Sequence, residues 1–157
     1  MRKPTLLLLL LISGFVIHSK SHAQSNSKNM KDYSVKIEIF RKGTYKIFSM
    51  QLENREFEAI KFYTNDKPCD TVCNITLAAD KVSEIELIIS NLSLEGLKDE
   101  YVNTGVKGEH HLMYFISIDG IEKEIYVYFE EQEELKQLFE KMMMIVAEEY
   151  RHRGEMR

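Results

Sequence analysis

The sequence has few of the residues that mark specialised protein classes. Its 157 residues include seven Gly, two Pro, two Cys and no Trp, whereas 44% are hydrophobic and 29% are charged. So little Gly and Pro excludes collagen and linker proteins, and two cysteines exclude a dense disulfide scaffold. The remaining composition is that of one ordinary globular domain with a core of normal size.

No apolar run is long enough to span a membrane. Residues 6–17 form an apolar run, and no second run of that length follows. Its 12 residues fall short of the roughly 20 that a spanning helix needs. The run follows Arg2 and Lys3 and precedes Ser21-His22-Ala23, which is typical of a secretory signal peptide cleaved after Ala23. We therefore expect an exported protein, periplasmic or secreted, whose mature chain is soluble and has no membrane partner. A retained signal anchor is the alternative.

Positive charge is scarce once residues 1–23 are removed. The loss of Arg2, Lys3 and Lys20 leaves 18 basic against 25 acidic residues, a formal charge of −7. Nucleic acids and anionic lipid surfaces are bound mainly through Lys and Arg. We therefore expect neither as a partner.

The two cysteines, Cys69 and Cys73, lie close together in the sequence. In an exported protein such a pair most simply forms a disulfide that closes a loop. A redox-active pair normally has two intervening residues rather than three, and a metal site needs more ligands than two thiolates. Between them, Asp70-Thr71-Val72 is similar to a short O-glycosylation signal of some exported bacterial proteins. This makes Thr71 a candidate for modification, and a plain polar loop is the alternative.

Hydrophobic periodicity predicts an α+β fold, with two helices packed on an antiparallel sheet in the order βββ-α-ββ-α. A flexible lead over residues 24–31 precedes a single domain over 32–153, and a short tail covers 154–157. The predicted strands are 33–40, 44–52, 56–64, 110–118 and 121–129, and the predicted helices are 79–92 and 131–150. The segments 65–78 and 93–109 are expected to be loops.

Each predicted hairpin has a turn that suggests a register. Asp119-Gly120 favours a type I′ turn, which places Leu112 opposite Val127 in the second hairpin. A two-residue turn at 42–43 would place Phe40 opposite Tyr45 in the first.

One face of the predicted sheet is unusually aromatic. Antiparallel sheets with one solvent-exposed face normally carry polar residues there, whereas Tyr, Phe and Met are favoured at protein interfaces. The predicted interaction face consists of Phe40, Tyr45, Ile47, Met113, Phe115, Tyr126 and Tyr128. The alternative is that one helix covers each face, or that the two hairpins form separate layers, so that these side chains belong to the core.

Catalytic patterns are scarce. The mature chain has three histidines, and two of them, His110 and His111, are neighbours on a predicted strand and point to opposite faces. The sequence has no Gly-rich phosphate loop, nucleophile elbow or helical metal-spaced His pair. We predict no catalytic, metal or cofactor site and expect a protein that is not an enzyme.

The arrangement of these elements resembles that of small exported bacterial domains of unknown function, in which a β-meander, a Leu-rich helix, a hairpin and a terminal helix follow one another. The segments that carry the resemblance are 35–40, 82–92, 97–101, 114–127 and 135–142. The layout also resembles some small protein inhibitors of exported metalloproteases, although no inhibitory residue can be assigned from it. We expect a non-catalytic binding domain with a protein partner or self-association. A carrier of a small apolar ligand between sheet and helices, and an inhibitor of an exported protease, are the alternatives.

Overall fold

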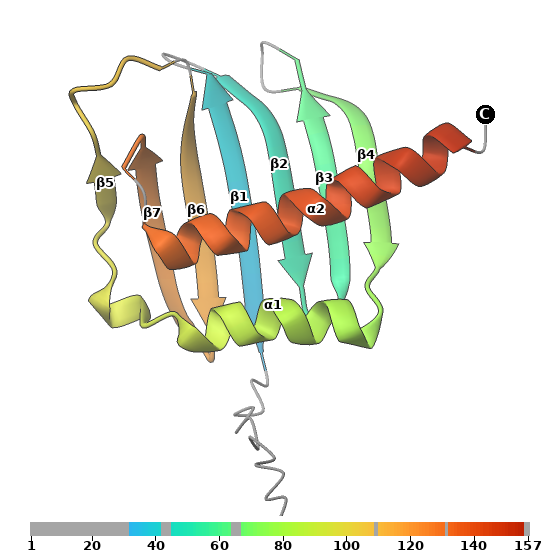
Figure 1. Cartoon of the computed structure of the whole chain (residues 1–157), viewed down its shortest axis with the longest axis horizontal. Coiled ribbons are helices and arrows are strands. Elements are labelled where there is room, and N and C mark those ends of the chain that lie inside the picture. The colour runs from blue at the N-terminus through green and yellow to red at the C-terminus, as the bar shows by residue number, and fades with distance from the viewer. Residues whose placement is uncertain (1–31, 42–44, 64–66, 109, 131, 156–157) are drawn as a thin grey trace, which may run out of the picture.

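The computed structural model describes residues 32–41, 45–63, 67–108, 110–130 and 132–155. In these residues, seven strands form one sheet, and both α-helices lie on the same face of it (Figure 1). The elements are β1 (Tyr33–Arg41), β2 (Tyr45–Glu53), β3 (Glu56–Phe62), β4 (Pro68–Thr76), α1 (Ala79–Asn91), the 3₁₀ turn η1 (Leu94–Gly96), β5 (Glu100–Val102), β6 (His110–Ile118), β7 (Ile121–Tyr128) and α2 (Glu133–Glu155). The α+β class and the mostly antiparallel sheet are confirmed, but the predicted order βββ-α-ββ-α is wrong, because the sheet has two more strands and a 3₁₀ turn follows α1. The predicted signal peptide lies outside the described residues.

The strands are ordered β4-β3-β2-β1-β6-β7-β5. Neighbouring strands are antiparallel except β5 and β7, which are parallel. The α1 helix carries the chain from the β4 edge of the sheet to the β5 edge, and the hairpin of β6 and β7 then fills the space between β1 and β5 (Figure 1).

The predicted cysteine loop is the edge strand β4, and no disulfide joins Cys69 to Cys73. Four residues of strand span about 13 Å, whereas disulfide-bonded Cα atoms are usually less than about 7 Å apart. Cys73 is buried opposite Ala59 of β3, and Cys69 is exposed. The β-branched residues of 71–76 pair with the open edge of β3, and this pairing replaces the expected loop.

The other extra strand, β5, lies in the segment predicted to be a loop. Leu94, Leu97 and Tyr101 of this segment are buried. The three-residue strand pairs with β7 at the far edge of the sheet. A strand this short leaves no period-two pattern long enough to detect.

The second hairpin has the predicted register, with Leu112 opposite Val127. Its turn residues Asp119 and Gly120 have φ angles of 50° and 82°. Positive φ at both central positions is what a type I′ turn requires, and Gly120 meets that requirement without steric cost.

The first hairpin differs from its predicted register, because three residues rather than two separate the paired Arg41 and Tyr45, and a β-bulge shifts the pairing further along the strands. Ile37 pairs with Met50, but Phe40 pairs with Lys46 and Arg41 with Tyr45, so Ile47 is the extra residue of the bulge. Successive ladder pairs point to opposite faces. Tyr45 therefore lies on the face opposite Phe40, and its predicted place on the interaction face is wrong.

The two helices share one core with the sheet. The buried cluster combines Val35 and Ile37 of β1 with Ile85 of α1 and Leu138 and Met142 of α2. The hydroxyl of Tyr114 in β6 donates a hydrogen bond to the Leu135 carbonyl at 3.2 Å and fixes the first turns of α2 on the sheet.

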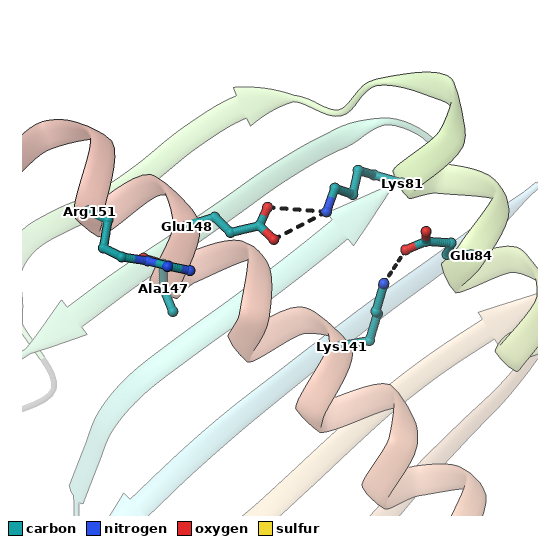
Figure 2. Close-up of polar contacts among 6 residues, drawn as sticks. All are labelled: Lys81, Glu84, Lys141, Ala147, Glu148 and Arg151. Carbon is teal, nitrogen blue, oxygen red and sulfur yellow. Dashed lines mark hydrogen bonds and ion pairs between the residues drawn. The ribbon is translucent and has the colours of Figure 1, made fainter.

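Two ion pairs join the helices along their outer sides. Lys81 Nζ lies 3.2 Å from Glu148 Oε2, and Lys141 pairs with Glu84 (Figure 2). The α2 helix runs to Glu155, beyond Tyr150 where the sequence pattern ends it. None of the helices in the described ranges is long and apolar enough to cross a membrane.

Candidate functional site

Both α1 and α2 lie on one face of the sheet (Figure 1). Neither helix covers the opposite face of the sheet, which we call the open face. Strand alternation and register place five of the seven predicted interaction residues on it: Phe40, Met113, Phe115, Tyr126 and Tyr128. All five are half-buried rather than fully exposed. The alternatives in which helices cover both faces, or the hairpins form separate layers, are excluded for the described residues.

Three rings form a continuous row across the open face. Phe40 of β1 stacks on His111 of β6, with ring centroids 5.1 Å apart and an interplanar angle of 4°. His111 in turn lies 5.0 Å from the ring of Tyr126 in β7, at 45°. Aromatic pairs at these separations add stabilisation beyond the area they bury. We call Phe40, His111 and Tyr126 the aromatic row.

The aromatic row is electrically neutral near pH 7. Burial, followed by the charge of His110, lowers the pKa of His111 below its usual value. Burial, followed by the neighbouring Tyr128 and Glu100, raises the pKa of Tyr126. Both shifts favour the uncharged forms, so the row presents uncharged aromatic rings.

Two of the predicted residues on this face make further contacts. The Tyr128 hydroxyl accepts a hydrogen bond from the Gly108 backbone N–H at 3.2 Å and lies 3.3 Å from the Gly108 carbonyl. Its ring also meets Phe129 edge-on at 4.9 Å. Tyr128 therefore holds the loop before β6, whereas Phe115 lies under Lys36, whose Nζ is 5.3 Å from the ring centroid.

The centre of the open face contains a buried carboxylate. Glu38 is 6% exposed, and its Oε1 lies 2.7 Å from Lys36 Nζ and 3.0 Å from Lys46 Nζ. Burial by itself would raise the pKa of Glu38, but the hydrogen bonds and charges of the two lysines outweigh it and lower the pKa. Lys46 also lies 4.4 Å from the ring centroid of Phe62. Sequence reasoning missed this network, because Lys46 reaches Glu38 only through the pairing of β1 with β2, and the observed register of that pair differs from the predicted one.

The end of the open face away from the aromatic row is acidic. Register places five glutamates there: Glu53, Glu56, Glu58, Glu122 and Glu124. The open face is therefore divided between an uncharged aromatic part and a negatively charged part.

Thr71, the candidate for O-glycosylation, lies in β4 rather than in a loop. It is exposed and pairs with Ile60 of β3 at the edge of the sheet. Its modification stays a prediction.

A second surface, which sequence reasoning did not locate, is a cavity of about 590 Å³ beneath the first turns of α2. The sheet contributes Ile39, Leu112 and Val127 to its lining, and α2 contributes Leu135 and Phe139. Polar residues, among them Glu130, Gln132 and Glu140, complete the lining. We call this the α2 cavity.

Gln132 fixes the helix end that borders the α2 cavity. Its Oε1 accepts a hydrogen bond of 2.7 Å from the backbone N–H of Leu135, so it caps one of the donors that a helix start leaves without a partner. Glu133 and Glu134 in the first turn complement the positive end of the helix dipole.

The described residues contain no group of three or more His, Cys, Asp and Glu side chains that could hold a metal ion. No protein-family model matches the chain, and no curated protein matches it. The resemblance to exported domains therefore stays a prediction, and the open face and the α2 cavity are the two features from which a function can be inferred.

Proposed function

We propose that the protein is a non-catalytic binding domain, acting after export, that captures another protein through the aromatic row of its open face. The observation that carries the proposal is the row itself, in which Phe40, His111 and Tyr126 stack across three strands on a face without a helix. Rigid, uncharged rings of this kind are favoured in protein interfaces because they bury area at little entropic cost.

The charge pattern defines the chemistry of the partner. The acidic end of the open face lies beyond Glu38 and its two lysines from the aromatic row, so a matching surface has an apolar part and, on one side of it, a rim of Lys or Arg. A second copy of this chain fits less well, since its formal net charge is −4 and its own open face is acidic. The partner is therefore a different protein with a basic rim.

The experiment is site-specific photo-crosslinking in the cells that produce the protein. A benzophenone side chain replaces Phe115, next to the aromatic row, or Tyr150, which is 61% exposed on α2 and serves as the control. We expect a crosslinked protein at position 115 that is absent at 150, that disappears with Tyr126→Glu, and that weakens as salt is raised.

A matched stability measurement accompanies the crosslinking. The variant Phe115→Glu with Tyr126→Glu should retain the circular dichroism spectrum and cooperative unfolding of the parent protein. If this variant does not fold, the rings are core residues and the proposal is wrong. Equal crosslinking at positions 115 and 150, or none, also contradicts it.

A further inference from the structure

The helix side of the sheet is covered only in part. Towards the centre, inner residues such as Ile37, Tyr114 and Ile125 are at most 1% exposed. The next inner residues along the same three strands, Ile39, Leu112 and Val127, are only half-buried. The helices therefore leave the same end of three adjacent strands only partly covered, and the α2 cavity lies at this end.

The position of α2 accounts for the loss of cover. Leu135 is 1% exposed and its carbonyl accepts the Tyr114 hydroxyl, which holds the helix against the middle of the strands. One turn later, Phe139 is half-buried and lines the cavity. The helix thus forms one wall of the cavity and the strand ends form the other.

We propose that the α2 cavity binds a small apolar molecule that carries no negative charge. A volume of about 590 Å³ lies within the range of pockets that hold drug-sized ligands, roughly 300 to 1,000 Å³. Such pockets are lined mainly by apolar side chains with a few polar groups that orient the ligand. Ile39, Leu112, Val127 and Leu135 supply the apolar lining, and an apolar space of this kind holds water poorly.

The charges around the cavity select against anions. Among the described residues, two carboxylates, Glu130 and Glu140, line it together with Lys136 and the two histidines His110 and His111. The whole chain carries a formal charge of −4. An anionic ligand would add a further negative charge next to the carboxylates, whereas an uncharged molecule meets no such repulsion.

The test uses N-phenyl-1-naphthylamine, an uncharged aromatic probe, and the parent protein with ¹³C-labelled Ile, Leu and Val methyl groups. We expect saturable methyl shifts at Ile39, Leu112, Val127 and Leu135 as the probe is added. Ile60 and Ile75, in strands β3 and β4 towards the other edge of the sheet, should not shift. Shifts confined to those two residues, or no saturable shift, would overturn the proposal.

A matched pair of variants then tests the space itself. Val127→Phe places a larger side chain, an aromatic ring, in the cavity, whereas Met113→Phe introduces the same ring on the open face one strand away. We expect Val127→Phe to bind the probe at least tenfold more weakly than the parent protein, as measured by probe fluorescence. Met113→Phe should bind the probe with unchanged affinity. Equal binding by both variants would overturn the proposal, and the methyl shifts of the parent protein decide the question if Val127→Phe does not fold.

Further comparisons distinguish the proposed ligand from other occupants of the cavity, and distinguish a failure of this proposal from a failure of the proposed function. The anionic analogue 1-anilinonaphthalene-8-sulfonate should bind at least tenfold more weakly than the uncharged probe, and equal binding would overturn the charge argument. Methyl shifts that depend on protein concentration without probe would show that a second copy fills the cavity, contrary to the proposal. Because the aromatic row variant Tyr126→Glu leaves the apolar lining intact, its probe binding should persist even if partner capture fails.

Discussion

The carboxylate at the centre of the open face gives the most direct test of how that face is organised. Glu38→Gln keeps the size of the side chain but removes the charge that Lys36 and Lys46 contact at 2.7 and 3.0 Å. An exposed ion pair contributes at most about 1 kcal/mol, and breaking a buried pair costs about 3 to 5 kcal/mol. The lysine side chains are 38% and 20% exposed and can turn towards water. We therefore expect Glu38→Gln to lower the free energy of unfolding by about 2 kcal/mol at pH 7.

The same substitution should change the dependence of stability on pH. The pKa of Glu38 is lowered in the folded protein from a usual value of 4.5. As the pH falls, the carboxylate protonates in the unfolded chain first, so the unfolded state binds more protons. The stabilisation from Glu38 is thus fully present above pH 4.5 and is lost as the pH falls through the lower folded pKa. Glu38→Gln should remove this part of the decline.

Urea unfolding followed by circular dichroism between pH 7 and pH 3 measures both effects. The control is Glu124→Gln, which removes an exposed carboxylate from the same face and should change the unfolding free energy by less than about 0.5 kcal/mol. A Glu38→Gln protein with the stability and the pH dependence of the parent would refute the reasoning. In that case the two lysines would not organise the open face.

The parts of the fold that follow from the sequence are those with strong local signals. The second hairpin is one, because Asp119-Gly120 has the conformational preference that sets its register. The α1 helix is another, since its apolar stripe recurs over more than three turns. The α2 helix was also predicted, although its end at Glu155 lies beyond the apolar pattern, in a polar stretch that the helix includes.

The parts that do not follow depend on contacts distant in sequence. Two bulges interrupt the pairing of β3 with β4, and Val72 and Cys73 are both buried, so β4 has no simple alternation. Tyr45 pairs with Arg41 instead of Phe40 and therefore lies on the helix side, a change that turn chemistry alone does not indicate.

The candidate sites divide in the same way. Alternation along β6 and β7 is sufficient to place Phe115 and Tyr126 on one face. The stacking of His111 between Phe40 and Tyr126 needs the pairing of β1 with β6, which joins segments far apart in the chain. The α2 cavity needs the position of a helix relative to three strand ends, and no pattern within one segment encodes that position.

Two further predictions concern His111 and the cysteines. His111→Phe keeps a ring in the aromatic row and removes an imidazole whose pKa is lowered by burial and then by His110. As the pH falls below about 6.5, the unfolded chain takes up a proton at His111 before the folded protein does. The parent should therefore lose stability as the pH falls from there, and the variant should lose less. Melting midpoints from pH 7.5 to pH 5.5 measure this, and the same dependence in both proteins would contradict it. For the cysteines, a thiol reagent should label exposed Cys69 in the native protein and Cys73 only on unfolding. Two unreactive sulfurs and a mass lower by about 2 Da would mean a disulfide, which the strand geometry of β4 does not permit, because about 13 Å separates positions four residues apart. Such a result would require β4 to leave β3 and would therefore also show that this edge of the sheet opens.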